Sequence, residues 1–529
     1  MSLNDCIALT NKTLIFLNSL KKLAPSLVHF LILLNLFSIS ACGSGSSEND
    51  VVAEPPVIVS AKLTQFSFLK LNNPNLDTDE HLNISGNMIT GRISTNTSVK
   101  DLIATFAHNG SEVSVSELVQ NSNSSVNNFS NIVTYTVKAS NGTQSEFQID
   151  LTKFTGLPII YIATDGGVPI ESKDDYVEGT VSLDGGRYND NLSQVIMKIR
   201  GRGNSTWGNP KKPFQMKLDD KMEFLDMPTD KKWLFLAEYS DKTMLRNTIA
   251  FEMGHISRLD WTPESSFAEV YLNEEYNGTY NITQKVEESD NRVVLGDTGY
   301  LLEIDQLSRL DADDVYFTTG DFLINIKEPN LEFDSVEYDF VKNLVNNFES
   351  VLHSSQFNDP VTGYVRFIDI DSFIDWYLIS EITKNVDSKS FSSIFLNVLP
   401  GEKIKMGPLW DFDLSFGNVD YADSQYSVGY WVKDHPWYAR LFQDPEFVIK
   451  IRERFSYFRN NQNYILNKID EHANNLKWAQ QENDNKWQTI GIYVWPNSVV
   501  LNSYDEEVEH LKNWYVERMN WLDGAFAEL

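Results

Sequence analysis

The chain has only two cysteines, and this scarcity limits how its fold can be held together. Cys6 and Cys42 both lie within the first 42 of the 529 residues. The rest of the chain therefore has no cysteine from which to form a disulfide, whatever its compartment permits. Its stability must come from burial, and a hydrophobic content of 42% over this length can supply two or three cores.

The segment 1–42 has the pattern of a targeting signal. Two lysines precede an apolar run at 27–37, which is too short to span a bilayer as a permanent helix. The run ends in Ile-Ser-Ala-Cys, which resembles the lipobox of bacterial lipoproteins and implies lipidation of Cys42. We therefore expect a cell-envelope protein, anchored to a membrane at Cys42 and facing the periplasm or the exterior. An ordinary secretory signal with an incidental cysteine is the alternative.

The charge balance argues against nucleic acid as a partner. The chain has 44 basic and 74 acidic residues, a net charge of −30. Binding to a phosphate backbone needs a net basic face, which this composition does not favour. The excess of acid suits a surface protein that stays soluble through self-repulsion.

A linker at 43–56 is followed by a segment, 57–153, that reads as a small module of β-strands. It is rich in Ser, Thr and Asn, and its short alternating runs, such as 132–137 and 147–151, are separated by Asn-Gly turns. This pattern predicts an all-β sandwich. The module resembles the immunoglobulin-like modules found near the anchor of bacterial surface lipoproteins. A spacer role is favoured over glycan or protein binding.

From residue 156 to 529 the pattern is mixed, and we expect an α+β domain. The sequence pattern predicts strands at 195–200, 214–218, 267–272 and 300–304. The stretches that read as helices are 241–257, 371–384 and 440–476. The last helix opens with a capping box formed by Ser503 and Glu506, and has one apolar face. That face consists of Val508, Leu511, Tyr515, Met519 and Leu522.

The most unusual segment is a glycine-rich turn between two predicted strands, within 198–217. Glycine lets backbone N–H groups approach an anion closely, because it has no Cβ. The turn is not a Walker A loop, since Asn209-Pro210 stands where Lys-Ser/Thr would hold phosphate and metal. It lies in a basic island in an acidic chain, as a polyphosphate site would require. The basic residues are Arg200, Arg202, Lys211, Lys212 and Lys217.

Downstream, charged residues follow one another in the order typical of a protein-kinase site. A helical glutamate, Glu252, comes first, and Asp387 follows directly after a predicted helix. Lys389 lies two residues later, where a cation can neutralise a phosphoryl group in transfer. Asp411 and Asp413 come last, and their carboxylates suit a hard cation such as Mg²⁺ or Mn²⁺.

Seven ordered segments make the chain resemble the spore-coat-protein-H (CotH) kinase family over roughly 158–529. In chain order they are Arg200–Trp207, Pro210–Pro213, Lys232–Ala237, Ser240–Asn247, Val270–Asn273, Gly299–Asp305 and Pro408–Gly417. The resemblance implies an atypical, two-lobed kinase-like fold. It also implies transfer of the ATP γ-phosphoryl group to serine residues of protein substrates at the cell surface or in the periplasm.

The same resemblance implies roles for individual residues. Asp387 matches the aspartate that orients and deprotonates the acceptor hydroxyl, and Asp411 or Asp413 matches the metal-binding aspartate. Arg202 and Gly203 belong to the turn that would hold the nucleotide. The lysine on the α- and β-phosphates is matched by Lys217, or alternatively by Lys285, with Glu252 as its helical partner.

Two departures from ordinary kinases leave alternatives open. Ser392 replaces the asparagine that binds a second metal ion, which favours one metal or a different ligand. Asp413 replaces the glycine of Asp-Phe-Gly and adds a carboxylate. Either change is also compatible with a catalytically silent surface scaffold or adhesin, or with a nucleotidyl or sugar phosphotransferase. Two carboxylates beside a cleft would also suffice for a glycosidase.

Overall fold

The computed structural model describes residues 61–76, 78–95, 97–186, 190–389 and 391–529. The predicted signal at 1–42, the linker at 43–56 and the lipidation site Cys42 lie outside the described residues and stay predictions. In the described part, no helix has the length and apolar character needed to cross a membrane.

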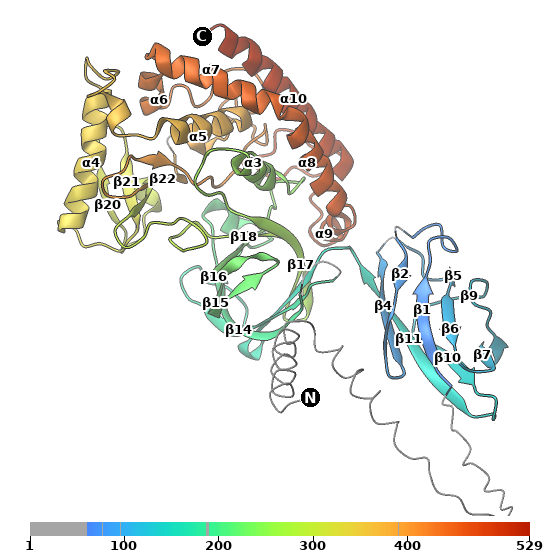
Figure 1. The fold of residues 1–529 in the computed structure, drawn as a ribbon. Coiled ribbons are helices and arrows are strands. Elements are labelled where there is room, and N and C mark those ends of the chain that lie inside the picture. Colours follow the sequence, from blue (N-terminus) through green and yellow to red (C-terminus); the bar gives the residue numbers. More distant parts are fainter. Residues whose placement is uncertain (1–60, 77, 96, 187–189, 390) are drawn as a thin grey trace, which may run out of the picture. The chain divides into compact units, whose positions relative to one another are not determined.

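The first strands form two sheets and a small strand pair around one hydrophobic core (Figure 1). One sheet has the order β2-β1-β6 and the other has the order β3-β4-β11-β10-β7-β8, while β5 pairs with β9. Tyr135 and Val137, alternate residues of β10, are buried in this core together with Phe66 of β1, and the alternation along β10 agrees with the pattern at 132–137. The strands are β1 (Leu63–Phe68), β2 (Glu80–His81), β3 (Asn83–Ser85), β4 (Met88–Ser94), β5 (Leu102–Ile103), β6 (Thr105–His108), β7 (Glu112–Val115), β8 (Leu118–Val119), β9 (Val126–Asn127), β10 (Val133–Lys138) and β11 (Gln144–Phe154).

The next seven strands close into a barrel, in the order β12-β13-β14-β15-β16-β18-β17. Parallel pairing of β12 with β17, from Ile159 opposite Glu269 onward, completes the closure and leaves no open edge. Aliphatic and aromatic side chains fill the interior, among them Met197, Met216 and Tyr280. The strands are β12 (Ile159–Thr164), β13 (Val177–Asp184), β14 (Leu192–Gly201), β15 (Phe214–Phe224), β16 (Met227–Leu236), β17 (Ser265–Leu272) and β18 (Glu275–Gln284).

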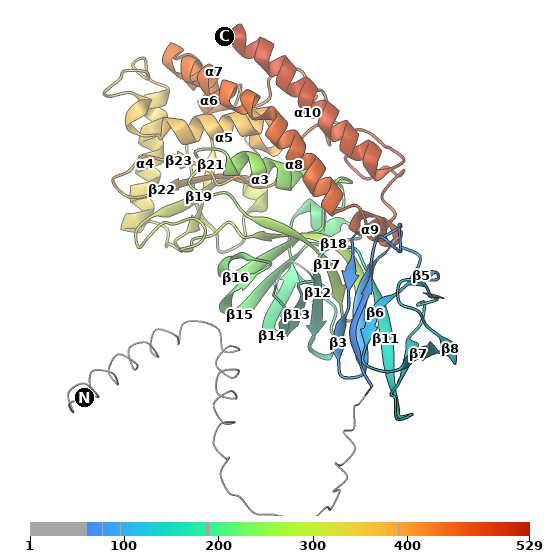
Figure 2. The ribbon, with the colours of Figure 1, turned by 45° about the vertical axis from the view of Figure 1, so that its right-hand side comes forward.

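A third sheet, of order β20-β21-β19-β22-β23, packs with the helices around the largest hydrophobic core (Figure 2). Helix α5 is almost entirely buried: its apolar side chains pack in this core, and Asp375, Ser380 and Glu381 are buried with them. The strands are β19 (Tyr300–Asp305), β20 (Val315–Thr318), β21 (Leu323–Glu328), β22 (Ile394–Val398) and β23 (Lys405–Met406). The helices are α3 (Arg246–His255), α4 (Val336–Leu352), α5 (Ile370–Thr383), α6 (Pro436–Leu441), α7 (Pro445–Asn460), α8 (Gln462–Asn475), α9 (Ala479–Trp487) and α10 (Tyr504–Ala527).

The α+β class predicted from the sequence is confirmed, and the element boundaries show where local chemistry ends a helix. The Ser503 hydroxyl accepts from Glu506 N at 3.2 Å and begins α10, whose predicted apolar face is buried. The single helix predicted at 440–476 is wrong. Pro445 begins α7 with Asp444 as its cap, and Asn461 separates α7 from α8.

A buried ion pair ties the last helix to the helix that precedes Asp387. Arg518 of α10 and Glu381 of α5 are both fully buried, and Nη2 lies 2.6 Å from Oε1. Arg518 also donates to the carbonyls of Ser427 and Gly429. Glu381 in turn accepts from the backbone N–H groups of 431–433.

We expect Arg518→Ala to lower the free energy of unfolding by about 3–5 kcal/mol, because it leaves the buried carboxylate of Glu381 without its cationic partner. Chemical denaturation of the purified protein measures this change. Arg452, an exposed arginine of α7, is the matched control, and its alanine variant should stay within about 0.5 kcal/mol of the parent. Equal stability of the two variants would contradict the importance of this pair.

Candidate functional site

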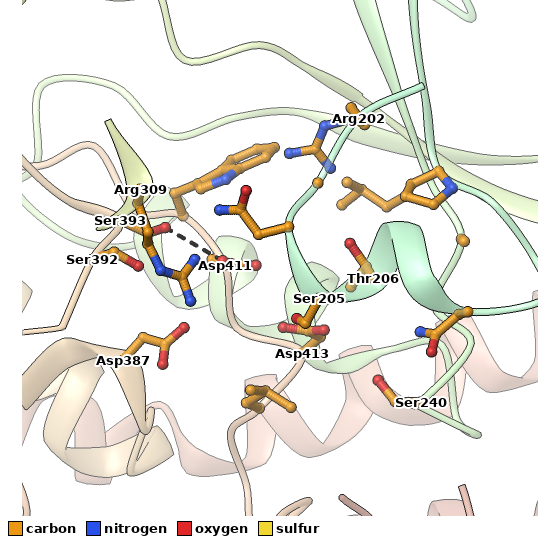
Figure 3. A pocket seen from close by; sticks show the side chains of 18 of the residues that line it. Arg202, Ser205, Thr206, Ser240, Arg309, Asp387, Ser392, Ser393, Asp411 and Asp413 are labelled. Atoms are coloured by element: carbon orange, nitrogen blue, oxygen red, sulfur yellow. Dashed lines mark hydrogen bonds between the residues drawn. The ribbon is translucent and has the colours of Figure 1, made fainter. Parts of the chain in front are cut away.

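A polar cavity of about 500 Å³ lies where the barrel meets the third sheet and α5. The turn between β14 and β15 supplies one wall, and the connector after β19 supplies another. Segments around Glu238, around Asp387 and at 410–414 also line the cavity, together with Tyr421, Trp495 and Pro496. Figure 3 shows the carboxylates and arginines of these segments facing a common space. The cavity therefore collects residues that are distant in the sequence.

The glycine-rich turn brings backbone and one arginine to this cavity. Gly203 has a φ of +82°, a left-handed conformation that favours glycine, and Arg202 N donates to Pro213 O at 3.2 Å. The Arg202 guanidinium lies over the Trp410 ring, 5.5 Å from its centroid. Burial lowers the pKa of Arg202, while the nearby carboxylates, with Asp411 first, oppose this shift. A partly buried arginine therefore faces the carboxylates of the cavity.

Three aspartates face the cavity from two loops. Asp387 follows α5, whereas Asp411 and Asp413 follow β23. Burial and, secondly, the charge of Asp411 raise the pKa of Asp387 to about 7. Burial, followed by the charges of Asp411 and Glu238, raises the pKa of Asp413 well above its usual range. The three carboxylates therefore repel one another in a poorly solvated space.

A chain of hydrogen bonds fixes Asp387 relative to Asp411. Asn385 Nδ2 donates to the carbonyl of Asp411 at 3.0 Å, and Asp387 N donates to Asn385 Oδ1 at 3.3 Å. On the other side, Ser393 Oγ donates to Asp411 Oδ2 at 3.3 Å. Ser393 N donates to Glu303 Oε1 at 3.0 Å. Asp411 and Ser393 both have left-handed backbone, with φ of 65° and 61°, so this network holds strained positions.

Glu238 is a cavity residue that the sequence motifs did not identify. It is buried, has a φ of 48°, and accepts from Asn247 Nδ2 at 3.1 Å. Burial and then the charge of Asp241 raise its pKa to about 8. Asn247 also accepts from Phe412 N at 2.7 Å, which links Glu238 to the loop of Asp413. The available signal was its position just before the Ser240–Asn247 block.

Three more charged residues of the cavity, on or after β19 and on β21, were not predicted as site residues. Glu303, Arg309 and Lys327 line the cavity. Burial and then the charge of Asp305 raise the pKa of Glu303 to about 7. Glu303 belongs to the Gly299–Asp305 block, so its position in that block was the signal. Nothing in the sequence distinguishes Arg309 or Lys327 from surface cations.

The cavity carboxylates fit a single Mg²⁺ or Mn²⁺ ion better than a protein-only metal cage. Among the described residues, no group of three or more His, Cys, Asp or Glu side chains has the arrangement of a metal site. Mg²⁺ is usually bound by one or two carboxylates together with substrate phosphates and water. Asp411 and Asp413, crowded enough to raise the pKa of Asp413, would be stabilised by such a cation.

The structure places four of the predicted site residues away from the cavity. Lys217 lies in a separate surface hollow, and Lys285 pairs with Glu287 at 3.3 Å. Glu252 contacts neither lysine, because its carboxylate accepts from Tyr464 and lies 3.0 Å from His472 Nε2. The predicted partnership of Glu252 with these lysines is therefore wrong.

Lys389 also turns away from Asp387. Its Nζ lies 2.6 Å from Asp434 Oδ2 and over the Trp431 ring. By contrast, Arg202, Gly203, Asp387, Asp411 and Asp413 all line the cavity. The spacing of Lys389 from Asp387 was correct for a kinase, but the short helical turn at Asp387–Lys389 directs the lysine to another partner.

The protein-family model described as CotH kinase protein matches residues 199–522. No curated protein matches the chain. Among solved structures, one similar chain is a proposed glycoside hydrolase from Bacteroides thetaiotaomicron, at 13% sequence identity and a TM-score of 0.17. The alignment covers 54% of this chain and 87% of that chain, and its TM-score is too low to inform the fold.

The raised carboxylate pKa values predict a pH-dependent stability in metal-free buffer. Between the unfolded pKa of about 4 and the folded pKa of about 7 for Asp387, the folded state holds protons that the unfolded chain has released. The free energy of unfolding should therefore fall as pH rises from about 4 to about 7.

Asp413→Asn removes one of these carboxylates and should flatten the dependence on pH. Denaturant titrations in EDTA at several pH values measure it. Asp297, which is exposed and outside the cavity, provides the control Asp297→Asn. If the free energy of unfolding of Asp413→Asn depends on pH as strongly as that of the parent, the proposed repulsion between the cavity carboxylates is contradicted.

Proposed function

This chain belongs to the CotH kinase protein family, and from that membership we propose that it transfers the γ-phosphoryl group of ATP to serine hydroxyls of proteins. The observation that carries the proposal is the convergence of Asp387, Asp411, Asp413 and Arg202 on one cavity. Phosphoryl transfer depends mainly on positioning and charge stabilisation, which these groups supply.

Each cavity residue has a role in this proposal. The glycine-rich turn and Arg202 bind the phosphates, because backbone N–H groups and a guanidinium both donate to anionic oxygens. Asp411 and Asp413 hold a divalent cation, which would neutralise phosphate charge when bound. Asp387 accepts the proton of the acceptor hydroxyl, and its pKa of about 7 suits a general base at neutral pH.

The finer features of the fold and location belong to the same proposal. We infer a two-lobed kinase-like arrangement, in which the barrel with its glycine-rich turn is one lobe and the helical part with Asp387 is the other. The preceding strands serve as an immunoglobulin-like spacer, and Cys42 carries the lipid that anchors the protein in the cell envelope. The acceptor is then a surface or periplasmic protein.

Asp387, the proposed general base, can be tested by an isosteric substitution. Asp387→Asn keeps the size and polarity of the side chain but removes its ability to take a proton. We expect transfer from γ-labelled ATP with Mg²⁺ or Mn²⁺ to fall about 10²- to 10⁴-fold, with nucleotide affinity largely retained. Autoradiography and a generic serine-rich acceptor mixture provide the measurement.

The same label-transfer assay, run on a gel, distinguishes protein phosphorylation from the alternative functions. Label arriving from α-labelled ATP indicates nucleotidyl transfer, and label on an added sugar indicates a sugar kinase. A parent protein that binds partners but transfers no label is a silent scaffold. Transfer by Asp387→Asn at the parental rate would contradict Asp387 as the base.

Two cations of the glycine-rich hairpin, Arg202 and Lys217, should differ in their effect on nucleotide binding. Arg202→Ala should weaken binding of Mg²⁺-ATP about 10- to 100-fold, since charged hydrogen bonds contribute about 1.5–3 kcal/mol. Lys217→Ala is the matched control, because Lys217 lies on the same hairpin but outside the cavity. Calorimetric titration measures both. A larger loss in Lys217→Ala than in Arg202→Ala would reverse the assignment.

A further inference from the structure

Arg309 is a cavity arginine whose guanidinium has no bonded partner among the described residues. It ends the short helical turn Leu307–Arg309 after β19 and lines the cavity. Its side chain forms neither a hydrogen bond nor an ion pair with any residue that the structure describes. It stacks on the Phe391 ring, 4.5 Å from the centroid. The stacking leaves the edge of the guanidinium, with its N–H donors, free for a ligand.

The charge of Arg309 acts on Asp387. Arg309 lowers the pKa of Asp387, against the larger effect of burial, and it also lowers that of Asp305. Figure 3 shows its guanidinium pointing into the space that Asp387 and Asp411 face. Arg309 therefore lies near the proposed base, Asp387, and forms no ion pair with it.

Other cations near Asp387 are paired with carboxylates or face a different part of the cavity. Lys389 is held by Asp434 at 2.6 Å. Lys327 lies 3.8 Å from Glu303 and 3.7 Å from Asp314. The guanidinium of Arg202 faces Asp411 and Asp413 from the glycine-rich turn. Arg309 is therefore the cation best placed to meet an anion that approaches Asp387.

We propose that Arg309 is a catalytic residue that contacts the γ-phosphoryl group as it moves to the acceptor, the role that the sequence had suggested for Lys389. This inference rests on the proposed function. The acceptor oxygen forms a bond to the γ-phosphorus while its proton passes to the Asp387 carboxylate. The bond from the γ-phosphorus to the bridging oxygen breaks, and ADP leaves with that electron pair.

During this step, negative charge is redistributed over the oxygens that Arg309 can reach with two parallel donors. A planar guanidinium pre-oriented by Phe391 meets this charge without reorganisation, which is the condition for strong electrostatic catalysis. Lysine offers a point charge instead of a fork, so the side chains are not equivalent at this position.

The test compares Arg309→Ala and Arg309→Lys with the parent protein. We expect kcat to fall about 10²- to 10³-fold in Arg309→Ala, with only partial recovery in Arg309→Lys. The Kd for a non-hydrolysable ATP analogue should change less than about threefold. Arg366→Ala is the matched control, because Arg366 also lies over an aromatic ring, is exposed and lies outside the cavity.

Two readouts separate a contact with the reacting group from a structural effect. Added guanidinium ion should restore part of the activity of Arg309→Ala and none of that of Asp387→Asn. Binding of Mg²⁺-ADP with fluoroaluminate, a mimic of the transferring phosphoryl, should weaken far more than binding of the ATP analogue. Equal losses for both ligands, or a kcat equal to that of the parent, would overturn the role of Arg309.

Failure of the proposed kinase function can be distinguished from failure of the role of Arg309. A parent protein that transfers no phosphoryl contradicts the kinase proposal, and calorimetry with Mg²⁺-ADP and fluoroaluminate then tests the anion contact alone. Loss of fluoroaluminate-dependent binding in Arg309→Ala but not in Arg366→Ala would support the contact. Equal binding by all three proteins, or by none, would overturn it.

Discussion

The site depends on the mutual repulsion of carboxylates that the fold holds together in a poorly solvated cavity. Two like charges 4 Å apart at an effective dielectric constant of 20 repel by about 4 kcal/mol, and Asp387, Asp411 and Asp413 all contribute to such repulsion. A divalent cation, or a proton, relieves it. The folded structure supports this arrangement through hydrogen bonds to backbone and side chain, with Asn385 joining the loops of Asp387 and Asp411.

Different parts of the fold hold the two sides of this cavity. On one side, the closed barrel fixes β14 and β15, so the turn between them presents Arg202 and Gly203 at a constant place. On the other, the buried helix α5 ends at Lys384, whose Nζ donates to the carbonyls of Asp423, Tyr426 and Val428. The loop that begins with Asn385 is therefore anchored just before Asp387.

Sequence reasoning predicted the features that depend on local pattern. The strand–turn–strand at the glycine-rich segment, the α+β class and the cap of α10 each follow from spacing over a few residues, and the structure contains all three. The order of motifs also placed Asp387, Asp411 and Asp413 in one site, and all three line the cavity.

Side-chain direction was the part that the sequence could not supply. Lys217 alternates on β15 with Met216 and Leu218, which are buried in the barrel core, and it lies in a separate surface hollow. The short helical turn after Asp387 directs Lys389 to Asp434. Successive side chains of a strand point to opposite faces, and a shift of one or two residues in a turn redirects a side chain. Which of these directions leads to the cavity depends on the tertiary packing. Glu238 and Arg309 were missed for a different reason. Both reach the cavity from segments that contain none of the recognised motifs.

The central claim is that this cavity binds a metal–triphosphate complex between the glycine-rich turn and Asp387. A crystal structure of the protein with Mg²⁺ and a non-hydrolysable ATP analogue tests it most directly. The account predicts the metal on Asp411 or Asp413, phosphate oxygens on Arg202, and the γ-phosphate between Arg309 and Asp387. A triphosphate bound instead beside Lys217 or Lys285, or bound in the cavity with its γ-phosphate directed away from Asp387, would contradict it.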